Sequence, residues 1–269
     1  MKLSRSPAVA GSFYPAQAEV LEAQVKALLA NRPKKSAKRP QVLVVPHAGY
    51  EYSGQVAASA FKEIEGENYE RVMLLGPSHH FWFEGAAATL DQVWQSPLGE
   101  FQVTRPQPWP LVETAYHKPE HCLEVMLPFL GLLCPQARIL PLLLSGGPEQ
   151  AQTLAVALEP FVEPNTLWVI SSDFCHVGPS FGFDPRPQGY KDGPALDKEA
   201  IDRIAALDIR GFENLLEQTG ATICGALPIL VALRLIRHFG LGPLVFKEYD
   251  NSARTGGRKN SVGYAAFFA

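Results

Sequence analysis

Short apolar runs alternate with longer amphipathic stretches along most of this chain. The apolar runs are bounded by polar or turn-forming residues, which is typical of strands buried on both faces of a sheet. In the stretches between them, apolar residues recur every three or four positions, as on the buried face of a helix. The expected strands cover residues 41–45, 71–75, 138–144, 167–170, 243–250 and 261–269, and the expected helices cover 18–32, 53–66, 122–134, 148–162, 195–217 and 223–239.

This alternation of strands and helices predicts the overall architecture. Strands separated by helices form βαβ units, whose strands run parallel. We therefore expect an α/β fold with a mostly parallel central sheet. No shift of composition divides the chain, so we predict a single domain over residues 1–269. We also expect Ser53 to cap its helix and a turn-rich excursion over residues 81–107.

Histidines follow three of the expected strands directly. His47 stands in "PHAGY", His79 and His80 in "GPSHH", and His176 in "SSDFCH". Ligand crevices of open α/β sheets lie beyond the carboxyl ends of the strands, so these histidines should gather on one rim. His47 and His79 are 32 positions apart, the span of one βαβ unit. If their strands are neighbours, about 4.8 Å separates them, and the two imidazoles can share one metal ion. Of the adjacent pair, we favour His79 as the ligand.

Three further side chains are candidates for the same chemistry, and each has an alternative role. Asp173 can orient an imidazole by accepting its second N–H, or it can cap the next turn. Glu124 lies in an apolar helix where a carboxylate needs a partner, which His121 three residues earlier can supply. That pair is either a structural ion pair or a proton-transfer and substrate-orienting pair. Cys224 opens an apolar helix and, on the residues alone, is best interpreted as a small buried hydrophobe.

Composition and charge exclude some classes of function. The chain has 269 residues, a net charge of −3 and a pI near 6.2, which disfavours nucleic acid as a partner. We interpret the basic cluster at residues 32–40 as a solvated linker. The four cysteines show no C-x-x-C spacing, which indicates free thiols in a reducing compartment. The stretch at residues 1–15 has no hydrophobic region long enough for a signal peptide, and the sequence has no apolar run of membrane length. We therefore expect a soluble cytoplasmic protein without membrane contact.

A series of motifs gives the chain a resemblance to a known family. From residue 6 to residue 268 the sequence contains, in this order, "SPAVAGSFYPA", "PHAGYEYSG", "LLGPSHH", "EHCLEVMLPFL", "SSDFCHVG", "TICGALPI" and "SVGYAAFFA". With these motifs it resembles the Memo family, whose bacterial members are called AmmeMemoRadiSam system protein B. The resemblance implies a three-layer α/β sandwich like that of the class III extradiol ring-cleaving dioxygenases. In such a sandwich the central sheet is expected to be mostly parallel, which agrees with the order of strands and helices in this chain.

The resemblance also implies roles for individual residues. It makes His47, His79 and Cys224 the ligands of one metal ion, which replaces the interpretation of Cys224 as a hydrophobe. It places Asp173, His176 and His121 along the pocket, where they support the ligands or transfer protons. The chain departs from the family pattern at Cys122, Met126 and Val177, which alters the expected pocket wall but none of the implied ligands.

The implied donor set indicates a kind of metal and a function. Two imidazoles and a soft thiolate favour Fe(II) or copper, with Zn(II) as an alternative. We hypothesise a non-haem iron or copper protein with dioxygenase-like or other redox activity on a small or peptide-borne substrate, with His176 and His121 as acid–base groups. The alternatives are a non-catalytic module that binds peptides or phosphopeptides, with residues 178–193 as its recognition surface, and a zinc-dependent hydrolase. The family's system name further implies a shared pathway with an AMMECR-type domain protein and a radical-SAM protein.

Overall fold

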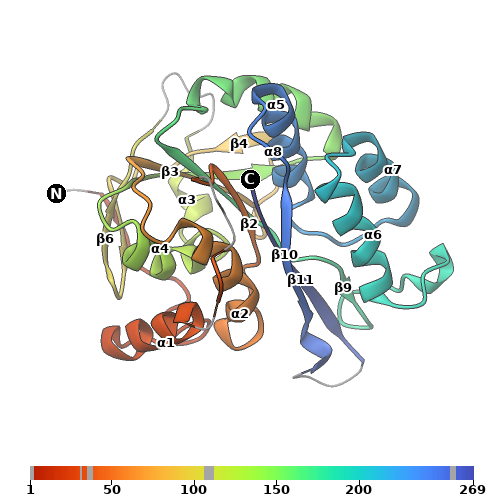
Figure 1. Cartoon of the computed structure of the whole chain (residues 1–269), viewed down its shortest axis with the longest axis horizontal. Coiled ribbons are helices and arrows are strands. Elements are labelled where there is room, and N and C mark those ends of the chain that lie inside the picture. Colours follow the sequence, from red (N-terminus) through yellow and green to blue (C-terminus); the bar gives the residue numbers. More distant parts are fainter. Residues whose placement is uncertain (1–2, 31, 35–38, 106–111, 255–258) are drawn as a thin grey trace.

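The computed structural model of the protein is built around an eight-stranded sheet (Figure 1). The structure describes residues 3–30, 32–34, 39–105, 112–254 and 259–269. The strands follow the order β10-β11-β2-β8-β3-β7-β4, and β9 pairs with β11 beside this path. Their bounds are Val42–Val45 (β2), Arg71–Pro77 (β3), Gly85–Ala87 (β4), Arg138–Ser145 (β7), Thr166–Ser171 (β8), His176–Val177 (β9), Val245–Asn251 (β10) and Ser261–Phe268 (β11). A second, three-stranded sheet consists of β1 (Ser4–Arg5), β5 (Val93–Ser96) and β6 (Gly99–Gln102).

The large sheet is mixed, with parallel strands at its centre. β2, β8, β3 and β7 run parallel to one another. On one flank β11 and β10, and on the other flank β4, run antiparallel to their neighbours. The expectation of a mostly parallel sheet is therefore correct for the centre and wrong for both flanks. Only residues 252–260 separate β10 from β11, which is too short for a crossover helix, so these two strands pair antiparallel.

The strands that precede His47 and His79 are not neighbours in the sheet, so the condition for a spacing of about 4.8 Å between them is not met. β8 lies between β2 and β3 and pairs with both of them. Two strand spacings of about 4.8 Å each therefore separate β2 from β3. The imidazoles of His47 and His79 can approach each other only through the turns that follow the strands, and the last residue of β8 becomes part of their surroundings.

Side chains of the central strands are buried on both faces of the sheet. Along β2, Leu43 and Val45 belong to one hydrophobic core, and Val42 and Val44 belong to the other. The first core is covered by α1 (Ala18–Ala30), α2 (Tyr50–Phe61) and α4 (Leu127–Leu133), and the second by α5 (Ala151–Leu158), α6 (Gly193–Ala205), α7 (Ile209–Thr219) and α8 (Ala226–Phe239). The two helical groups lie on opposite sides of the sheet in Figure 1, which gives a three-layer α/β arrangement. A short helix, α3 (Thr114–His117), precedes the loop that leads to α4.

Two helices differ from the expectation at their beginnings. α2 begins at Tyr50, before Ser53, and the Ser53 hydroxyl donates to the carbonyl of Ala48 instead of capping the helix. The predicted helix over 122–134 is a 3-10 turn at Glu124–Met126 followed by α4. Pro128 explains this break because it has no N–H to donate to the residue four positions earlier. The segment at 81–107, expected to be turn-rich, contains β4, β5 and β6 as far as it is described.

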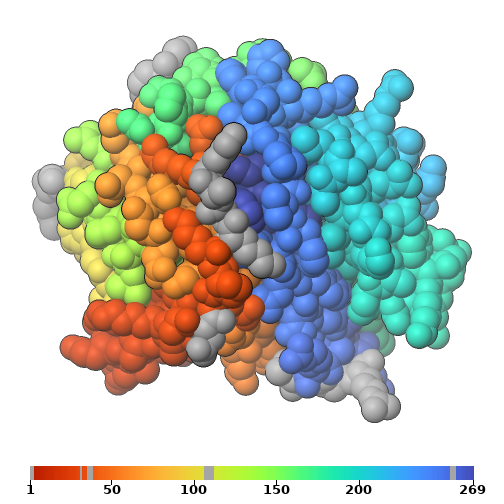
Figure 2. All heavy atoms as spheres, viewed as in Figure 1, coloured from red at the N-terminus to blue at the C-terminus, as the bar shows by residue number. Residues whose placement is uncertain are grey.

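The surface strand β10 forms one edge of the sheet. In the space-filling view it runs between the α2 side and the α6 side of the molecule (Figure 2). Charged residues protect such an edge against pairing with other chains, and here Lys247 and Glu248 form ion pairs with Glu63 and Arg32. Residues 35–38 of the predicted basic linker lie outside the described residues. Within the described part of the chain, no helix combines the length and the apolar character that crossing a membrane requires.

Candidate metal centre

Three histidines from separate segments form a cluster beyond the carboxyl ends of the central strands. His47 follows β2, His79 follows β3, and His121 lies in the loop before α4. One ligand nitrogen from each ring lies within 4.8 Å of the other two. The ring centroids of His47 are 5.1 Å from His79 and 5.4 Å from His121, and His79 and His121 are 4.8 Å apart. His47 is 2% exposed, whereas the side chains of His79 and His121 are 29% and 19% exposed, so the cluster opens to solvent on their side.

A glycine near the end of β3 allows the loop with His121 to come this close. A Cβ atom built at Gly76 would lie 2.6 Å from Sγ of Cys122 and 2.7 Å from Cδ2 of Leu123. Both distances are shorter than any van der Waals contact, so a side chain at residue 76 would push this loop away. The Cys122 thiol also donates to the carbonyl of Pro77, which holds the loop to the strand.

Hydrogen bonds fix the protonation of the His47 ring. The Ser171 hydroxyl donates its single proton to the carbonyl of Cys122 at 2.7 Å. It can therefore only accept from His47, whose Nδ1 lies 2.7 Å away, so the ring carries its proton on Nδ1. The other nitrogen, Nε2, keeps its lone pair and faces Sγ of Cys224 at 3.3 Å. Burial, together with the charge of His79, holds the pKa of His47 well below its ordinary value, so the ring is neutral at physiological pH.

Glu120 fixes the His79 ring in the same way. The Nδ1 atom of His79 donates to Oε1 of Glu120 at 2.9 Å, and the backbone N–H of His79 donates to Oε2 at 2.7 Å. The backbone N–H groups of His121 and Cys122 also donate to Oε1. Burial raises the pKa of Glu120, but the hydrogen bond to His79, its charge and the backbone amides lower it more. The pKa therefore lies well below the ordinary range, and the carboxylate stays ionised. In the neutral ring of His79 the lone pair is therefore on Nε2.

Glu120 is the residue that reading the sequence missed. Its signal was the dipeptide Glu120–His121, which places a carboxylate beside a candidate histidine. Glu124, the carboxylate chosen from the sequence, lies in a different environment. It forms a buried ion pair with Arg5 at 2.8 Å and accepts from the N–H groups of Ala8 and Val9 and from the Tyr14 hydroxyl. The expected pair of Glu124 with His121 is therefore wrong, although the expectation that Glu124 needs a buried partner holds.

Cys224 lies beside the histidine cluster, immediately before α8. Its sulfur is 3.3 Å from Nε2 of His47 and accepts the backbone N–H of Asp173 at 3.2 Å. The close packing depends on Gly225, where an added Cβ atom would lie 2.3 Å from Cβ of Ser172. Burial and the charge of Asp173 raise the pKa of the Cys224 thiol far above its ordinary value, so without a metal ion the thiol stays protonated.

Asp173 and His176 lie in the turn that follows β8. Oδ1 of Asp173 accepts the backbone N–H of His47 at 2.7 Å, so Asp173 orients the turn and not an imidazole ring. Burial raises the pKa of Asp173 above its ordinary value. Nδ1 of His176 lies 3.1 Å from the carbonyl of Thr222, which can only accept, so Nε2 of His176 carries the lone pair. The ring of Phe181 packs against this imidazole, with 5.1 Å between the centroids.

His121 differs from His47 and His79 because no hydrogen bond from a described residue fixes its ring. Its Nδ1 atom is 3.3 Å from Oε1 of Glu120 and forms only an electrostatic pair there. The ring packs against Phe13, with 4.9 Å between the centroids. Burial, followed by the charge of His47, lowers the pKa of His121 to about 4. His80, the second histidine of its pair, is exposed and lies near Glu120 and His121 at the outer side of the cluster.

Asp197 anchors the turn that carries Asp173 and His176. Its Oδ1 atom accepts the backbone N–H of Cys175 at 2.9 Å, and its Oδ2 atom accepts the Tyr249 hydroxyl at 2.7 Å. Burial raises the pKa of Asp197 to about 6, although the groups that donate to it oppose this shift. In the folded protein Asp197 therefore holds its proton to higher pH than in the unfolded chain.

This pKa predicts a specific pH dependence of stability. The contribution of Asp197 is fully present below pH 4 and is lost as pH rises through 6, because ionising the buried carboxyl costs free energy. The loss should be on the order of 3 kcal/mol, at about 1.4 kcal/mol per pKa unit. We expect Asp197→Asn to lose less stability than the wild type between pH 4 and pH 7, measured by urea unfolding at both pH values. Equal losses in the two proteins would contradict this role of Asp197.

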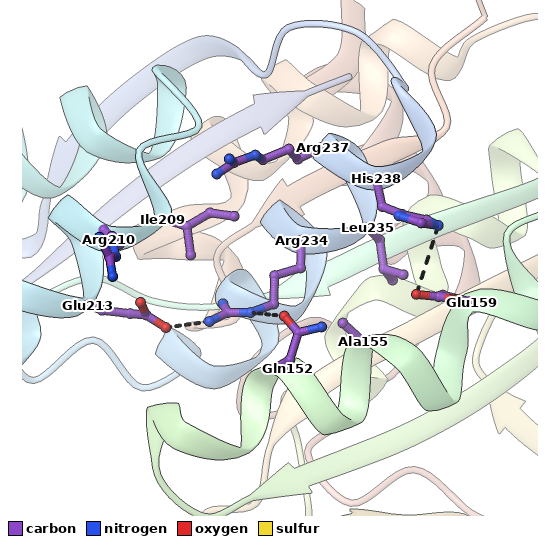
Figure 3. Close-up of a pocket in the computed structure, with 10 residues that line it drawn as sticks. All are labelled: Gln152, Ala155, Glu159, Ile209, Arg210, Glu213, Arg234, Leu235, Arg237 and His238. Atoms are coloured by element: carbon purple, nitrogen blue, oxygen red, sulfur yellow. Dashed lines mark hydrogen bonds and ion pairs between the residues drawn. The ribbon is translucent and has the colours of Figure 1, made fainter.

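A large cavity elsewhere in the molecule does not contain the cluster. It has a volume of about 770 Å³ and lies among α5, α7 and α8, the helices on the side of the sheet that contains the second core (Figure 3). Arg234 spans it by donating to Gln152 and to Glu213, and His238 faces Glu159. The residues that line it include a single histidine and no cysteine, so the candidate site remains the histidine cluster.

Comparisons with known proteins agree with the motifs. The profile of a family described as Memo-like protein matches residues 5–268. The Protein memo-1 homolog of Caenorhabditis elegans is 34% identical over 254 residues, which cover 88% of this chain and 72% of that protein. A MEMO1 family protein of Saccharolobus solfataricus is 31% identical over 98% of both chains. Protein MEMO1 of Homo sapiens is 30% identical over 97% of this chain and 96% of its own length.

Proposed function

The chain belongs to the Memo-like protein family, and we propose that its histidine cluster binds one transition-metal ion. The proposed ligands are Nε2 of His47, Nε2 of His79 and Sγ of Cys224. The observation that carries this proposal is that the Nδ1 atom of each ring is hydrogen-bonded, which leaves Nε2 of the neutral ring as the ligand atom. The Ser171 hydroxyl accepts a hydrogen bond from Nδ1–H of His47, and the carboxylate of Glu120 accepts one from Nδ1–H of His79. Metal-ligating histidines are oriented in this way by partners on their second nitrogen.

The choice of Cys224 as the third ligand rests on two contacts. Its sulfur lies 3.3 Å from Nε2 of His47, so both atoms can reach one ion with little movement. It also accepts the backbone N–H of Asp173, a contact that favours a thiolate over a thiol. One ligand nitrogen of His121 lies within 4.8 Å of those of His47 and His79, a group that does not include the Cys224 sulfur. Among the described residues, however, no hydrogen bond fixes the tautomer of the His121 ring. We assign His121 to proton transfer beside the ion.

The donor set favours Fe(II) or copper and is compatible with Zn(II). Imidazole suits all three ions, and a soft thiolate selects against magnesium and calcium. When bound, such an ion supplies Lewis acidity or one-electron redox chemistry to a substrate. We propose redox chemistry of the dioxygenase-like type on a small or peptide-borne substrate. The extradiol dioxygenases that the fold is proposed to resemble use a carboxylate as third ligand, so a thiolate at this position would change the redox tuning.

Two histidines beside the proposed ion can exchange protons with a substrate. His121 has a lowered pKa and remains neutral at physiological pH, so its lone pair can accept a proton. His176 gives its Nδ1 proton to the carbonyl of Thr222 and presents Nε2 as a base. Phe13 packs against the His121 ring and Phe181 against the His176 ring. The acid–base roles predicted for His121 and His176 therefore remain part of the proposal.

Anaerobic titration of protein produced without an affinity tag tests this function. We expect one Fe(II) or Cu(I) ion per chain, bound more tightly than magnesium or calcium by several orders of magnitude, and oxygen uptake by the loaded protein with a suitable reductant. Absence of stoichiometric binding of any transition-metal ion would refute the metal site. Tight binding of Zn(II) alone, with no oxygen uptake, would refute the redox assignment and favour hydrolysis.

One observation favours a second candidate function, peptide capture. A groove of about 890 Å³ lies between the loop at residues 178–193 and the β10–β11 segment, and it is lined by Phe183, Pro185, Lys191 and Asn251, among others. Apolar rings and charges of both signs can bind an extended peptide. Peptide binding that survives loss of His47 and His79 but is lost in Phe183→Ser would support this function over the metal-dependent one.

A further inference from the structure

We infer that Arg5 is a positioning residue for the histidine cluster. Its guanidinium holds the main chain of Glu120 and thereby fixes the Nδ1–H tautomer of His79. Arg5 lies in β1, far from His79 in the sequence, and contacts none of the three imidazoles in any described interaction. The inference rests on the proposed function only in treating Nε2 of His79 as a metal ligand. The effect on the tautomer itself does not depend on a metal ion.

Two nitrogens of the Arg5 guanidinium donate hydrogen bonds, and the third forms an ion pair without a hydrogen bond of good geometry. Nε donates to the carbonyl of His117 at 2.7 Å, and Nη2 donates to the carbonyl of Glu120 at 2.6 Å. Nη1 forms the ion pair with Oε2 of Glu124 at 2.8 Å, in which both side chains are almost fully buried. The guanidinium also lies 4.5 Å above the Trp94 ring. These contacts fix the orientation of Arg5, which binds the loop at the carbonyl groups of His117 and Glu120.

Glu120 transmits this constraint to the imidazole. Its carbonyl accepts from Arg5, while its carboxylate accepts from the ring and the backbone of His79 and from the backbone of His121 and Cys122. The side chain of Glu120 is 2% exposed, so no solvent replaces a contact that is lost. If the Glu120 main chain moves, its carboxylate loses the alignment with Nδ1 of His79. The proton of His79 can then move to Nε2, the atom proposed to bind the ion.

The shape of arginine is needed for this role. A planar guanidinium can donate in several fixed directions at once, whereas a lysine ammonium is a compact charge on a flexible stem. In Arg5→Lys the ammonium can keep the ion pair with Glu124 but cannot also hold the carbonyls of His117 and Glu120. A buried ion pair alone is weak evidence for stability. The tautomer of the His79 ring therefore distinguishes a positioning role of Arg5 from simple structural support. The melting temperature does not distinguish them.

Nitrogen-15 NMR of the histidine rings in the metal-free protein tests the inference. In the wild type at neutral pH we expect His79 as the Nδ1–H tautomer. In Arg5→Lys we expect a mixture with the Nε2–H tautomer, and Glu120→Gln should show the same change because its amide no longer accepts as a carboxylate does. The matched control is Lys247→Met, which breaks another buried ion pair, with Glu63, on β10. The control should leave the His79 tautomer unchanged.

Metal affinity gives a second readout. Loss of a group that orients a metal ligand typically weakens metal binding by about 10- to 100-fold. We expect a loss of this size in Arg5→Lys and none in Lys247→Met. If the wild type binds no metal ion, the proposed function fails, but the tautomer result still decides the role of Arg5. If folded Arg5→Lys keeps the Nδ1–H tautomer of His79, the inference is overturned whatever the metal result.

A second variant covers the case in which Arg5→Lys does not fold. The double substitution Arg5→Met with Glu124→Gln removes both buried charges while leaving an amide oxygen to accept from the Tyr14 hydroxyl. Replacing a buried ion pair by uncharged side chains of similar volume often preserves folding. We expect this variant to show the mixed tautomers of His79. A pure Nδ1–H signal in it would overturn the inference.

Discussion

Replacing both His47 and His79 by alanine should weaken transition-metal binding by at least about a thousandfold. Structural sites with three or four ligands bind with about 10–16 kcal/mol, so each ligand contributes several kcal/mol, and this variant lacks two. Competition with a chelator of known affinity under anaerobic conditions measures the change. The fold should persist, because the main-chain contacts of both histidines, such as the N–H of His47 to Asp173, do not need the rings.

The matched control removes two imidazoles outside the proposed ligand set. In His80→Ala with His238→Ala, one exposed ring beside the cluster and one near Glu159 are lost. We expect this variant to bind the metal ion within a few-fold of the wild type. Equal losses in the control and in the His47/His79 variant would mean that histidines bind the ion non-specifically, and the proposed site would be abandoned.

Cys224→Ser should change the pH dependence of metal binding as well as its strength. The pKa of the Cys224 thiol is raised by burial, so the thiol must release its proton when it binds the ion. The imidazole of His47 is already neutral, because its pKa is lowered, and contributes no proton release. His79 is present in both the wild type and Cys224→Ser, so the difference between the two proteins reports on the thiol. The affinity of the wild type should therefore rise more steeply between pH 6 and pH 8 than that of Cys224→Ser, by about one logarithmic unit per pH unit. Cys224→Ser should also lose any thiolate-to-metal charge-transfer band.

His121→Asn is the informative comparison for this prediction. If Cys224 is the third ligand, His121→Asn keeps the pH slope and most of the affinity but should impair turnover. A flat pH profile in the wild type, combined with a large loss of affinity in His121→Asn, would instead make His121 the third ligand. The two variants therefore separate the ligand set His47, His79 and Cys224 from a set of three histidines.

Most of the strands, and the segments that carry the proposed ligands, could be predicted from the sequence. Apolar runs such as residues 71–75 are buried on both faces and have no other plausible environment in a folded chain of this size. In a sheet whose strands are parallel, histidines directly after such runs lie together beyond the carboxyl ends of the strands. This reasoning holds although β8 separates β2 from β3, because the strand ends, and not the strand spacing, bring His47 and His79 together.

The residues that fix the rings could not be predicted in this way. Ser171 became a partner of His47 only because β8 lies between the two histidine-bearing strands, and strand order is not encoded in local periodicity. Glu120 and Glu124 are four positions apart in one apolar segment, and helical spacing favoured Glu124 as the partner of His121. In the structure the guanidinium of the distant Arg5 and the backbone N–H groups of Ala8 and Val9 bind the Glu124 carboxylate instead. Contacts of such long sequence separation are decided by tertiary packing.

The central claim is that His47, His79 and Cys224 together bind one metal ion. A crystal structure of the anaerobically loaded protein, with anomalous scattering recorded at the iron, copper and zinc edges, tests it most directly. We expect one anomalous peak at bonding distance from Nε2 of both histidines and from Sγ of Cys224. An ion bound elsewhere would contradict this claim. A peak in this cluster that lies beyond bonding distance of the Cys224 sulfur, or of either imidazole, would also contradict it.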